Sequence, residues 1–267
     1  MINLFGKTSL LIMLGLTVIS CGDENYKSES NIKNIFGKDD RKPIPWNATP
    51  KAWRTIGKIS GGCTGTLVGP SLVLTAAHCI FDKRNKVPSI KLMAGYYKGR
   101  YKASSWARQV WYGNSYPNKG KKTHHDWAIL ELRQPIGHSV GWLGVQKHSE
   151  AEIARNFSGL TVAGYSKDFR NGEVGSFSHC RTVKYRKYSG PEYRVYHDCD
   201  TARGSSGGPF LRMIDGKMTI VGLNVAEYRY DSKESLHLTR YSDKYANVGI
   251  GSDNFFKTLK NLRNRGK

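Results

Sequence analysis

A serine, a histidine and an aspartate in three short motifs have the residue types that nucleophilic catalysis requires. Ser206 lies in residues 204–209, which read Gly-Ser-Ser-Gly-Gly-Pro and bring no bulky side chain near the hydroxyl. His78 follows an apolar run, in the sequence Thr-Ala-Ala-His-Cys, and Asp126 precedes a second apolar run. A histidine oriented by a carboxylate can take the proton of a serine hydroxyl. The three residues therefore predict an acyl-transfer site.

Residues 204–208 also satisfy the Gly-x-Ser-x-Gly pattern of the nucleophile elbow in α/β-hydrolases. That fold requires a helix after the serine, and its acid and histidine follow the serine in the chain. Here the order is histidine, aspartate, serine, and the residues after the serine read as a hairpin with Asp215-Gly216 as its turn. The order and the hairpin exclude the elbow.

The three motifs resemble those of the chymotrypsin-fold serine peptidases, both in their residue types and in their order along the chain. The family signatures Thr-Ala-Ala-His-Cys and Gly-Asp-Ser-Gly-Gly-Pro are matched by residues 75–79 and, with one departure, by residues 204–209. The resemblance implies that Ser206 attacks a peptide carbonyl, that His78 is the general base and acid, and that Asp126 orients the histidine.

The same resemblance implies an oxyanion hole at the backbone N–H groups of Gly204 and Ser206. The expected protein is a monomeric serine endopeptidase that acts on proteins or peptides and needs no cofactor. No residues in the sequence have metal-ligand spacing, and the scattered His179, His197 and Asp198 do not predict a site. Two rival hypotheses are an esterase and a catalytically idle basic binding protein on the same scaffold.

Ser205 is the departure from the family signature. Most animal digestive relatives have an aspartate there, which pairs with a new N-terminus after activation, and a neutral serine cannot form that ion pair. The departure points to the branch that resembles the staphylococcal V8 and Bacillus glutamyl endopeptidases. The sequence Asp-Asp-Arg at residues 39–41 also resembles the start of those bacterial enzymes.

The substrate pocket is expected around Asp200, which lies six residues before Ser206, where trypsin-like relatives place the acid that binds Arg or Lys. Several glutamyl endopeptidases have an Asp-Thr pair there, as this chain does, and select glutamate through a histidine on a later strand. This chain has Asn224 at that position. Glu227, if it faces the pocket, would favour a basic side chain. We expect cleavage after Lys or Arg; the alternative reads Asp200 as a turn residue.

Short β-rich runs broken by glycine and proline fill most of the chain from residue 53 onward. With the resemblance, they imply an all-β fold of two six-stranded antiparallel barrels over residues 51–251. The first barrel would carry His78 and Asp126, and the second would carry Ser206.

Two further segments are expected outside the barrels. A polar connector covers residues 133–157, with a short helix near its end. Residues 252–267 predict a C-terminal amphipathic helix, because Phe255, Phe256, Leu259 and Leu262 share one side and Ser252 is a suitable N-cap.

The first twenty residues predict a lipoprotein signal peptide. Lys7 precedes a largely apolar run over residues 8–19, which is short for a bilayer span. The run ends in Val-Ile-Ser-Cys, which resembles a bacterial lipobox, so we expect cleavage before Cys21 and acylation of its thiol. Residues 21–50 read as a tether and a lead-in strand. The protein would be exported and membrane-anchored, facing the periplasm or the cell exterior, or secreted.

Five cysteines leave one unpaired, and lipidation of Cys21 would explain the odd thiol. The alternative is a plain cysteine near an ordinary cleavage site. The other four can pair in three ways. The resemblance implies a bridge between Cys63 and Cys79, which leaves Cys180 with Cys199. Closing the first loop would contribute roughly 3 kcal/mol and would hold the histidine corner to a neighbouring strand.

The formal net charge is +21, a balance that favours anionic neighbours. Residues 81–122 carry eleven lysines and arginines against one aspartate, with seven tyrosines and tryptophans interleaved. Such a face could bind anionic lipid head groups or nucleic acid. The alternative, which the sequence favours, is a solvated barrel face with aromatic strand residues.

Overall fold

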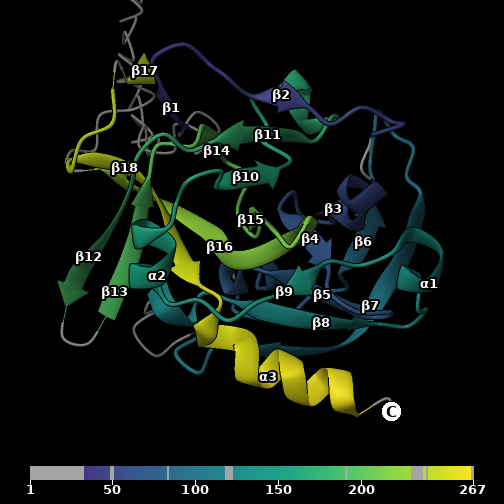
Figure 1. Cartoon of the computed structure of the whole chain (residues 1–267). Coiled ribbons are helices and arrows are strands. Elements are labelled where there is room, and N and C mark those ends of the chain that lie inside the picture. Colours follow the sequence, from purple (N-terminus) through teal and green to yellow (C-terminus); the bar gives the residue numbers. More distant parts are fainter. Residues whose placement is uncertain are drawn as a thin grey trace, which may run out of the picture.

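Antiparallel strands make up most of the regular secondary structure (Figure 1) in a computed structural model that describes residues 33–48, 51–82, 84–117, 123–189, 192–229, 237–238 and 240–265. The strands form a closed barrel, a nine-stranded sheet and a small three-stranded sheet. The all-β class predicted from the sequence is confirmed. The expected signal peptide, Cys21 and the first part of the expected tether lie outside the described residues.

The first half of the chain forms the closed barrel. Its strands are β3 (Ile56–Ile59), β4 (Thr64–Leu67), β5 (Leu72–Thr75), β6 (Lys91–Ala94), β7 (Ala103–Tyr112) and β8 (Ala128–Leu132). They close in the order β3-β4-β5-β8-β7-β6. On β5 and β8, Val73 and Leu130 face the barrel core, whereas Leu74 and Ile129 pack into a second core shared with the other half of the molecule. Strands buried on both faces read as continuous apolar runs, as these two do in the sequence.

The second half forms a sheet whose hydrogen-bonded path stays open. Its strands are β2 (Lys42–Pro43), β9 (Gly144–Val145), β10 (Thr161–Gly164), β11 (Ser176–His179), β12 (Val183–Ser189), β13 (Glu192–His197), β15 (Pro209–Ile214), β16 (Lys217–Arg229) and β18 (Tyr245–Gly251). The path runs β12-β13-β18-β16-β15-β10-β11-β2, and β9 pairs with β16. The two-part β architecture is confirmed, but the second part recruits β2 from the N-terminal segment and β9 from the connector. Among the described residues this hydrogen-bonded path is not closed, and the arrangement is consistent with the second of the two expected barrels.

The N-terminal segment also supplies the centre of the third sheet. β1 (Lys33–Phe36) pairs antiparallel with β14 (Thr201–Ala202) and parallel with β17 (His237–Leu238). β14, which lies just before the serine motif, is therefore paired with residues from the start of the described chain.

Helices are few and short. They are α1 (Gly137–Val140), α2 (Glu150–Arg155), α3 (Asp253–Asn264) and the 3-10 turns η2 (Lys51–Thr55), η3 (Ala77–Ile80), η4 (Thr123–His125) and η5 (Arg170–Gly172). The predicted C-terminal helix is α3, and it buries Phe255, Leu259 and Leu262. Ser252 precedes it, but its hydroxyl donates to Gln146 O and makes no capping bond. No helix among the described residues is long and apolar enough to cross a membrane.

Candidate active site

Asp126 and His78 form a hydrogen-bonded pair beside the ends of two neighbouring barrel strands. β5 leads into η3, which carries His78, and Asp126 lies just before β8, whose Ala128 pairs with Thr75. The Asp126 carboxylate lies 2.8 Å from His78 Nδ1 and accepts a hydrogen bond from the His78 backbone N–H at 3.0 Å. Asp126 is only 5% exposed, so little water competes for it. One carboxylate thus fixes both the ring and the backbone of the histidine.

The serine motif is a tight turn that requires glycine at two positions. Gly204 and Gly207 have φ angles of +100° and +80°. A Cβ on Gly204 would lie 2.3 Å from Tyr165 O, and a Cβ on Gly207 would lie 2.3 Å from Thr64 O. Both the backbone angle and the close approach exclude a side chain there. The glycines of the motif are therefore a requirement of the backbone.

Two backbone N–H groups of this turn are left without a protein acceptor. The N–H groups of residues 205, 207 and 208 donate to backbone carbonyls. Among the described residues, those of Gly204 and Ser206 donate to none. The carbonyl of Arg203 accepts a hydrogen bond from Lys167 N at 2.8 Å, and in a trans peptide the Gly204 N–H points the opposite way. These are the two donors that the sequence analysis assigned to an oxyanion hole.

Thr64 on β4 joins the serine turn to the first barrel. Its backbone N–H donates to Ser206 O at 2.9 Å, and its Oγ1 donates to Gly204 O at 2.8 Å. The same Oγ1 accepts a hydrogen bond from Tyr165 N at 2.9 Å. Nothing in the sequence points to this residue, because a threonine in a strand carries no signal of contacts with residues more than a hundred positions away.

The Cys63–Cys79 disulfide lies against both the histidine and the serine. Cys79 Sγ is 3.5 Å from His78 Nε2 and 3.8 Å from Ser206 O. His78 comes from the first barrel and Ser206 from the second half, so the two residues lie at the junction between the halves. The pairing expected from the sequence is confirmed here and at the second bridge, Cys180–Cys199.

Comparison with known proteins decides the family. The sequence model of the family described as Trypsin matches residues 39–248, most of the chain. The chain belongs to the trypsin family. Glutamyl endopeptidase of Bacillus licheniformis is 27% identical over 213 residues, covering 73% of this chain and 60% of that protein. Serine protease 23 of Bos taurus is 29% identical over 237 residues, covering 75% of this chain and 58% of that protein. The chain thus spans about three fifths of the length of these curated relatives.

Solved structures of two proteases share the fold of this trypsin-family chain. A Glu endopeptidase superposes with a TM-score of 0.65 at 23% identity, covering 85% of this chain and 98% of that chain. Protease Anisep from Arthrobacter nicotinovorans gives a TM-score of 0.57 at 22% identity, covering 80% of this chain and 96% of that chain. These likenesses support the two-part β architecture described above.

Ser205 is the residue at which the chain departs from the trypsin-family signature. It lies within the serine turn and is buried, with 2% exposure. Its hydroxyl makes a short hydrogen bond with the hydroxyl of Ser166, and its carbonyl accepts one from Asn224 Nδ2 at 3.3 Å. A neutral pair of hydroxyls therefore occupies this position, and the turn is held without an ion pair at residue 205.

Asp200, expected in the substrate pocket, holds the N-terminal segment instead. Its Oδ1 accepts a hydrogen bond from Phe36 N at 2.8 Å, and its Oδ2 accepts one from Asp40 N at 3.0 Å. The side chain is buried, and burial raises the pKa of its carboxyl to about 6. These contacts favour the structural interpretation of Asp200 over the pocket interpretation.

Asn224, also expected in the pocket, contacts His197 inside the second half. His197 Nε2 lies 3.1 Å from Asn224 Oδ1, and both side chains are almost fully buried. Burial lowers the pKa of His197 to about 3, so the ring is neutral at physiological pH. Of the three residues expected to line the pocket, Glu227 on β16 is the one with partial exposure.

Two groups of cysteine and histidine among the described residues lie close enough together to hold a metal ion. One contains His78 with the first disulfide, and the other contains His197 with the second. Because the cysteines of both groups are joined in disulfides, their sulfurs are not thiolates and do not act as metal ligands.

Proposed function

We propose that this trypsin-family chain is a serine endopeptidase with Ser206 as nucleophile, His78 as general base and acid, and Asp126 as the residue that orients the histidine. The observation that carries the proposal is the 2.8 Å contact between Asp126 Oδ2 and His78 Nδ1, which leaves Nε2 for the serine hydroxyl. The family match supports the same roles.

The reaction follows in two halves. Ser206 Oγ attacks the scissile carbonyl carbon while His78 Nε2 takes the hydroxyl proton, and the imidazolium then gives this proton to the leaving amine as the C–N bond breaks. The product is an ester between Ser206 and the acyl fragment. Water attacks that ester, its proton passes to Nε2 and then to Ser206 Oγ, and the acid product leaves. Asp126 stays ionised throughout and stabilises the imidazolium.

The backbone N–H groups of Gly204 and Ser206 would bind the oxyanion of each tetrahedral intermediate. Their lack of an acceptor among the described residues supports this role. Losing one such donor typically costs about 3 kcal/mol of transition-state stabilisation. Any residue at position 204 that moves this backbone would therefore abolish most activity.

A preference for a basic side chain before the cleaved bond would depend on Glu227, because this carboxylate is partly exposed whereas Asp200 and Asn224 are buried. We expect a peptide library to show cleavage after Lys or Arg. Glu227→Gln should lower kcat/KM for Arg substrates and leave that for Ala substrates unchanged. A library profile dominated by Glu would reject this preference.

Export and lipid anchoring through Cys21 are part of the same proposal. The two disulfides fit a protein of an oxidising compartment. Mass spectrometry of protein from its host should find an N-terminal diacylated or triacylated Cys21, and Cys21→Ala should move the protein from the membrane fraction to the soluble fraction. Unmodified Cys21 would contradict the anchor without affecting the catalytic assignment.

The test of the catalytic assignment is labelling of the folded mature chain with a fluorophosphonate probe. Wild type should be labelled, and Ser206→Ala should not. Ser205→Ala is the matched control, because it removes the neighbouring hydroxyl and should retain labelling. No labelling of well-folded wild type would reject an activated serine and favour a catalytically idle binding protein.

A further inference from the structure

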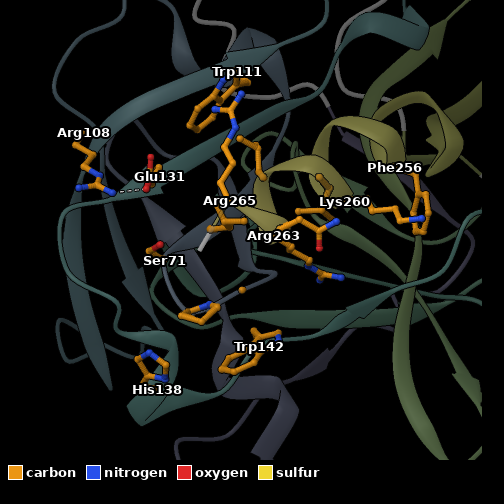
Figure 2. A pocket seen from close by; sticks show the side chains of 16 residues that line it. Ser71, Arg108, Trp111, Glu131, His138, Trp142, Phe256, Lys260, Arg263 and Arg265 are labelled. Atoms are coloured by element: carbon orange, nitrogen blue, oxygen red, sulfur yellow. Dashed lines mark hydrogen bonds and ion pairs between the residues drawn. The ribbon is translucent and has the colours of Figure 1, made fainter. Parts of the chain in front are cut away.

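A hollow of about 800 Å³ lies between the first barrel and α3. Ser71 and Leu72 at the start of β5, Glu131 on β8 and the last turns of α3 contribute to its walls. In Figure 2, Trp111 and Trp142 lie at opposite ends of the hollow, with Arg263 and Arg265 between them. The volume falls within the range of about 300–1,000 Å³ that ligand pockets occupy.

The floor of the hollow is apolar. Leu72, Leu259 and Leu262 line it, and all three are buried. Trp142 also lines it but is 46% exposed, which is unusual for so large an apolar side chain. A ligand that covered Trp142 would therefore gain hydrophobic stabilisation.

The rim of the hollow carries positive side chains, most of which have no acidic partner among the described residues. Its one acidic side chain, Glu131, is already paired with Arg108. Lys260 and Arg265 form no ion pair with the described residues, and Arg265 lies 5.8 Å from the centre of the Trp111 ring. Two unpaired positive groups beside an apolar floor favour a ligand that carries both negative charge and apolar groups.

Arg263 adds to this positive potential. Its guanidinium donates hydrogen bonds to the carbonyl oxygens of Val68 and Leu143, and burial lowers its pKa. Carbonyl oxygens fix the position of the group but do not neutralise its charge. A buried charge of this kind is screened less by salt than an exposed one.

We propose that this hollow binds an acidic peptide segment, with apolar side chains on the floor and carboxylates at Lys260, Arg263 and Arg265. The concave shape disfavours a flat membrane surface. The buried leucines of the floor offer no hydrogen-bond partner to the polar edges of nucleic-acid bases, whereas they can pack against the apolar side chains of a peptide. Acidic peptides match both the charge of the rim and the chemistry of the floor.

The hollow is separate from the proposed catalytic residues but shares their strands. Leu72 pairs with Glu131 at the hollow, and Thr75 pairs with Ala128 near the histidine and the aspartate. Three residues of β-strand span about 10 Å. The site is thus a second recognition surface, and peptide should bind it whether or not Ser206 is reactive.

The test measures binding of a fluorescein-labelled, end-blocked peptide, Glu-Leu-Asp-Phe-Glu-Asp, to the full mature chain with Ser206→Ala. We expect Lys260→Glu to weaken binding about tenfold. Lys257→Glu is the matched control, because it makes the same charge change on α3 at an exposed residue outside the hollow. It should change affinity less than about twofold. Trp142→Ala should also weaken binding, with an unchanged melting temperature.

Three outcomes would overturn the proposal. If Lys260→Glu and Lys257→Glu weakened peptide binding equally, the peptide would be attracted by the overall positive charge of the protein and not by a specific site. Absence of measurable binding to the well-folded chain would reject the site directly. Displacement of the peptide by a single-stranded oligonucleotide or by phosphatidylglycerol vesicles, with the same dependence on Trp142, would assign the hollow to another class of ligand.

Discussion

Single hydrogen bonds hold the candidate site together. Thr64 makes three that join the two halves, with the serine turn and Tyr165, and Asp126 makes two with His78 inside the first half. Thr64 and Asp126 are buried, so removing the partner of either residue leaves a buried polar group unsatisfied at a cost of about 1–3 kcal/mol.

We predict that Thr64→Val lowers kcat about tenfold or more while KM changes little, because Gly204 O and Tyr165 N lose their partner and the oxyanion donors shift. Unfolding free energy should fall by about 1–3 kcal/mol. Steady-state kinetics with a fluorogenic peptide and thermal unfolding measure the two effects.

Thr66→Val, two positions along the same strand, is the control for that substitution. Thr66 is as buried as Thr64, but its Oγ1 has no hydrogen-bond partner among the described residues. The variant should keep full activity and at least wild-type stability. Equal losses of kcat in the two variants would show that the Thr64 hydroxyl does not position the turn.

His197 makes the folding stability depend on pH. Burial lowers its pKa to about 3 in the folded protein, whereas the unfolded chain has a pKa of about 6.5. Between these values the unfolded chain binds more protons, so this contribution to stability is present above pH 6.5 and is lost as pH falls toward 3. The slope reaches at most about 1.4 kcal/mol per pH unit.

The variant His197→Gln should therefore show a shallower loss of stability between about pH 7 and pH 4.5, measured by urea unfolding. Asp200 acts in the opposite direction, because burial raises its folded pKa to about 6, and its contribution favours folding as pH falls. Wild type and variant share that contribution, so their difference isolates His197. Parallel profiles would refute a buried neutral histidine.

At the scale of strands and loops, local motifs predicted the elements that carry the chemistry. Residues 72–79 form an apolar strand and a small-residue corner, and both features are visible in consecutive residues. Pairing across long separations was not predictable in this way. β1 beside β14 and the two N–H contacts of Asp200 join residues at least 160 positions apart. The spacing of Asp200 from Ser206 favoured a pocket residue over a turn residue, because spacing carries no signal of these distant contacts.

We predict that Asp200→Ala loosens the N-terminal segment. The amides of Phe36 and Asp40 would lose their acceptor, and hydrogen exchange at these two amides should accelerate about tenfold or more. Asp215→Ala, at an exposed turn, is the control and should leave both amides protected. Unchanged exchange in Asp200→Ala would mean that the strand pairing of β1 alone holds the segment.

At the scale of the whole molecule, charge is the dominant feature. The chain carries a net charge of +21 and its substrates are expected to be proteins, so acidic proteins should be attracted over distances of several ångströms beyond contact. Salt shortens that reach to about 8 Å at physiological ionic strength.

We predict that kcat/KM for an acidic carrier protein falls about threefold to tenfold between low and high salt, because steering of its encounter is screened. For the same cleavable segment in a basic carrier protein, kcat/KM should rise or stay constant over this range of salt concentration. Rates measured in parallel at several salt concentrations give both slopes. Identical slopes would show that net charge does not guide the encounter.

The first disulfide links chemistry to the compartment in which the chain resides. Its sulfur lies beside both the imidazole and the main chain of the serine, so the bond that fixes Cys79 supports a surface that both halves of the site contact. In a reducing cytoplasm that bond would be missing, and the corner that carries the histidine would be held by fewer links. Oxidation of the two cysteines would then complete the support of the site.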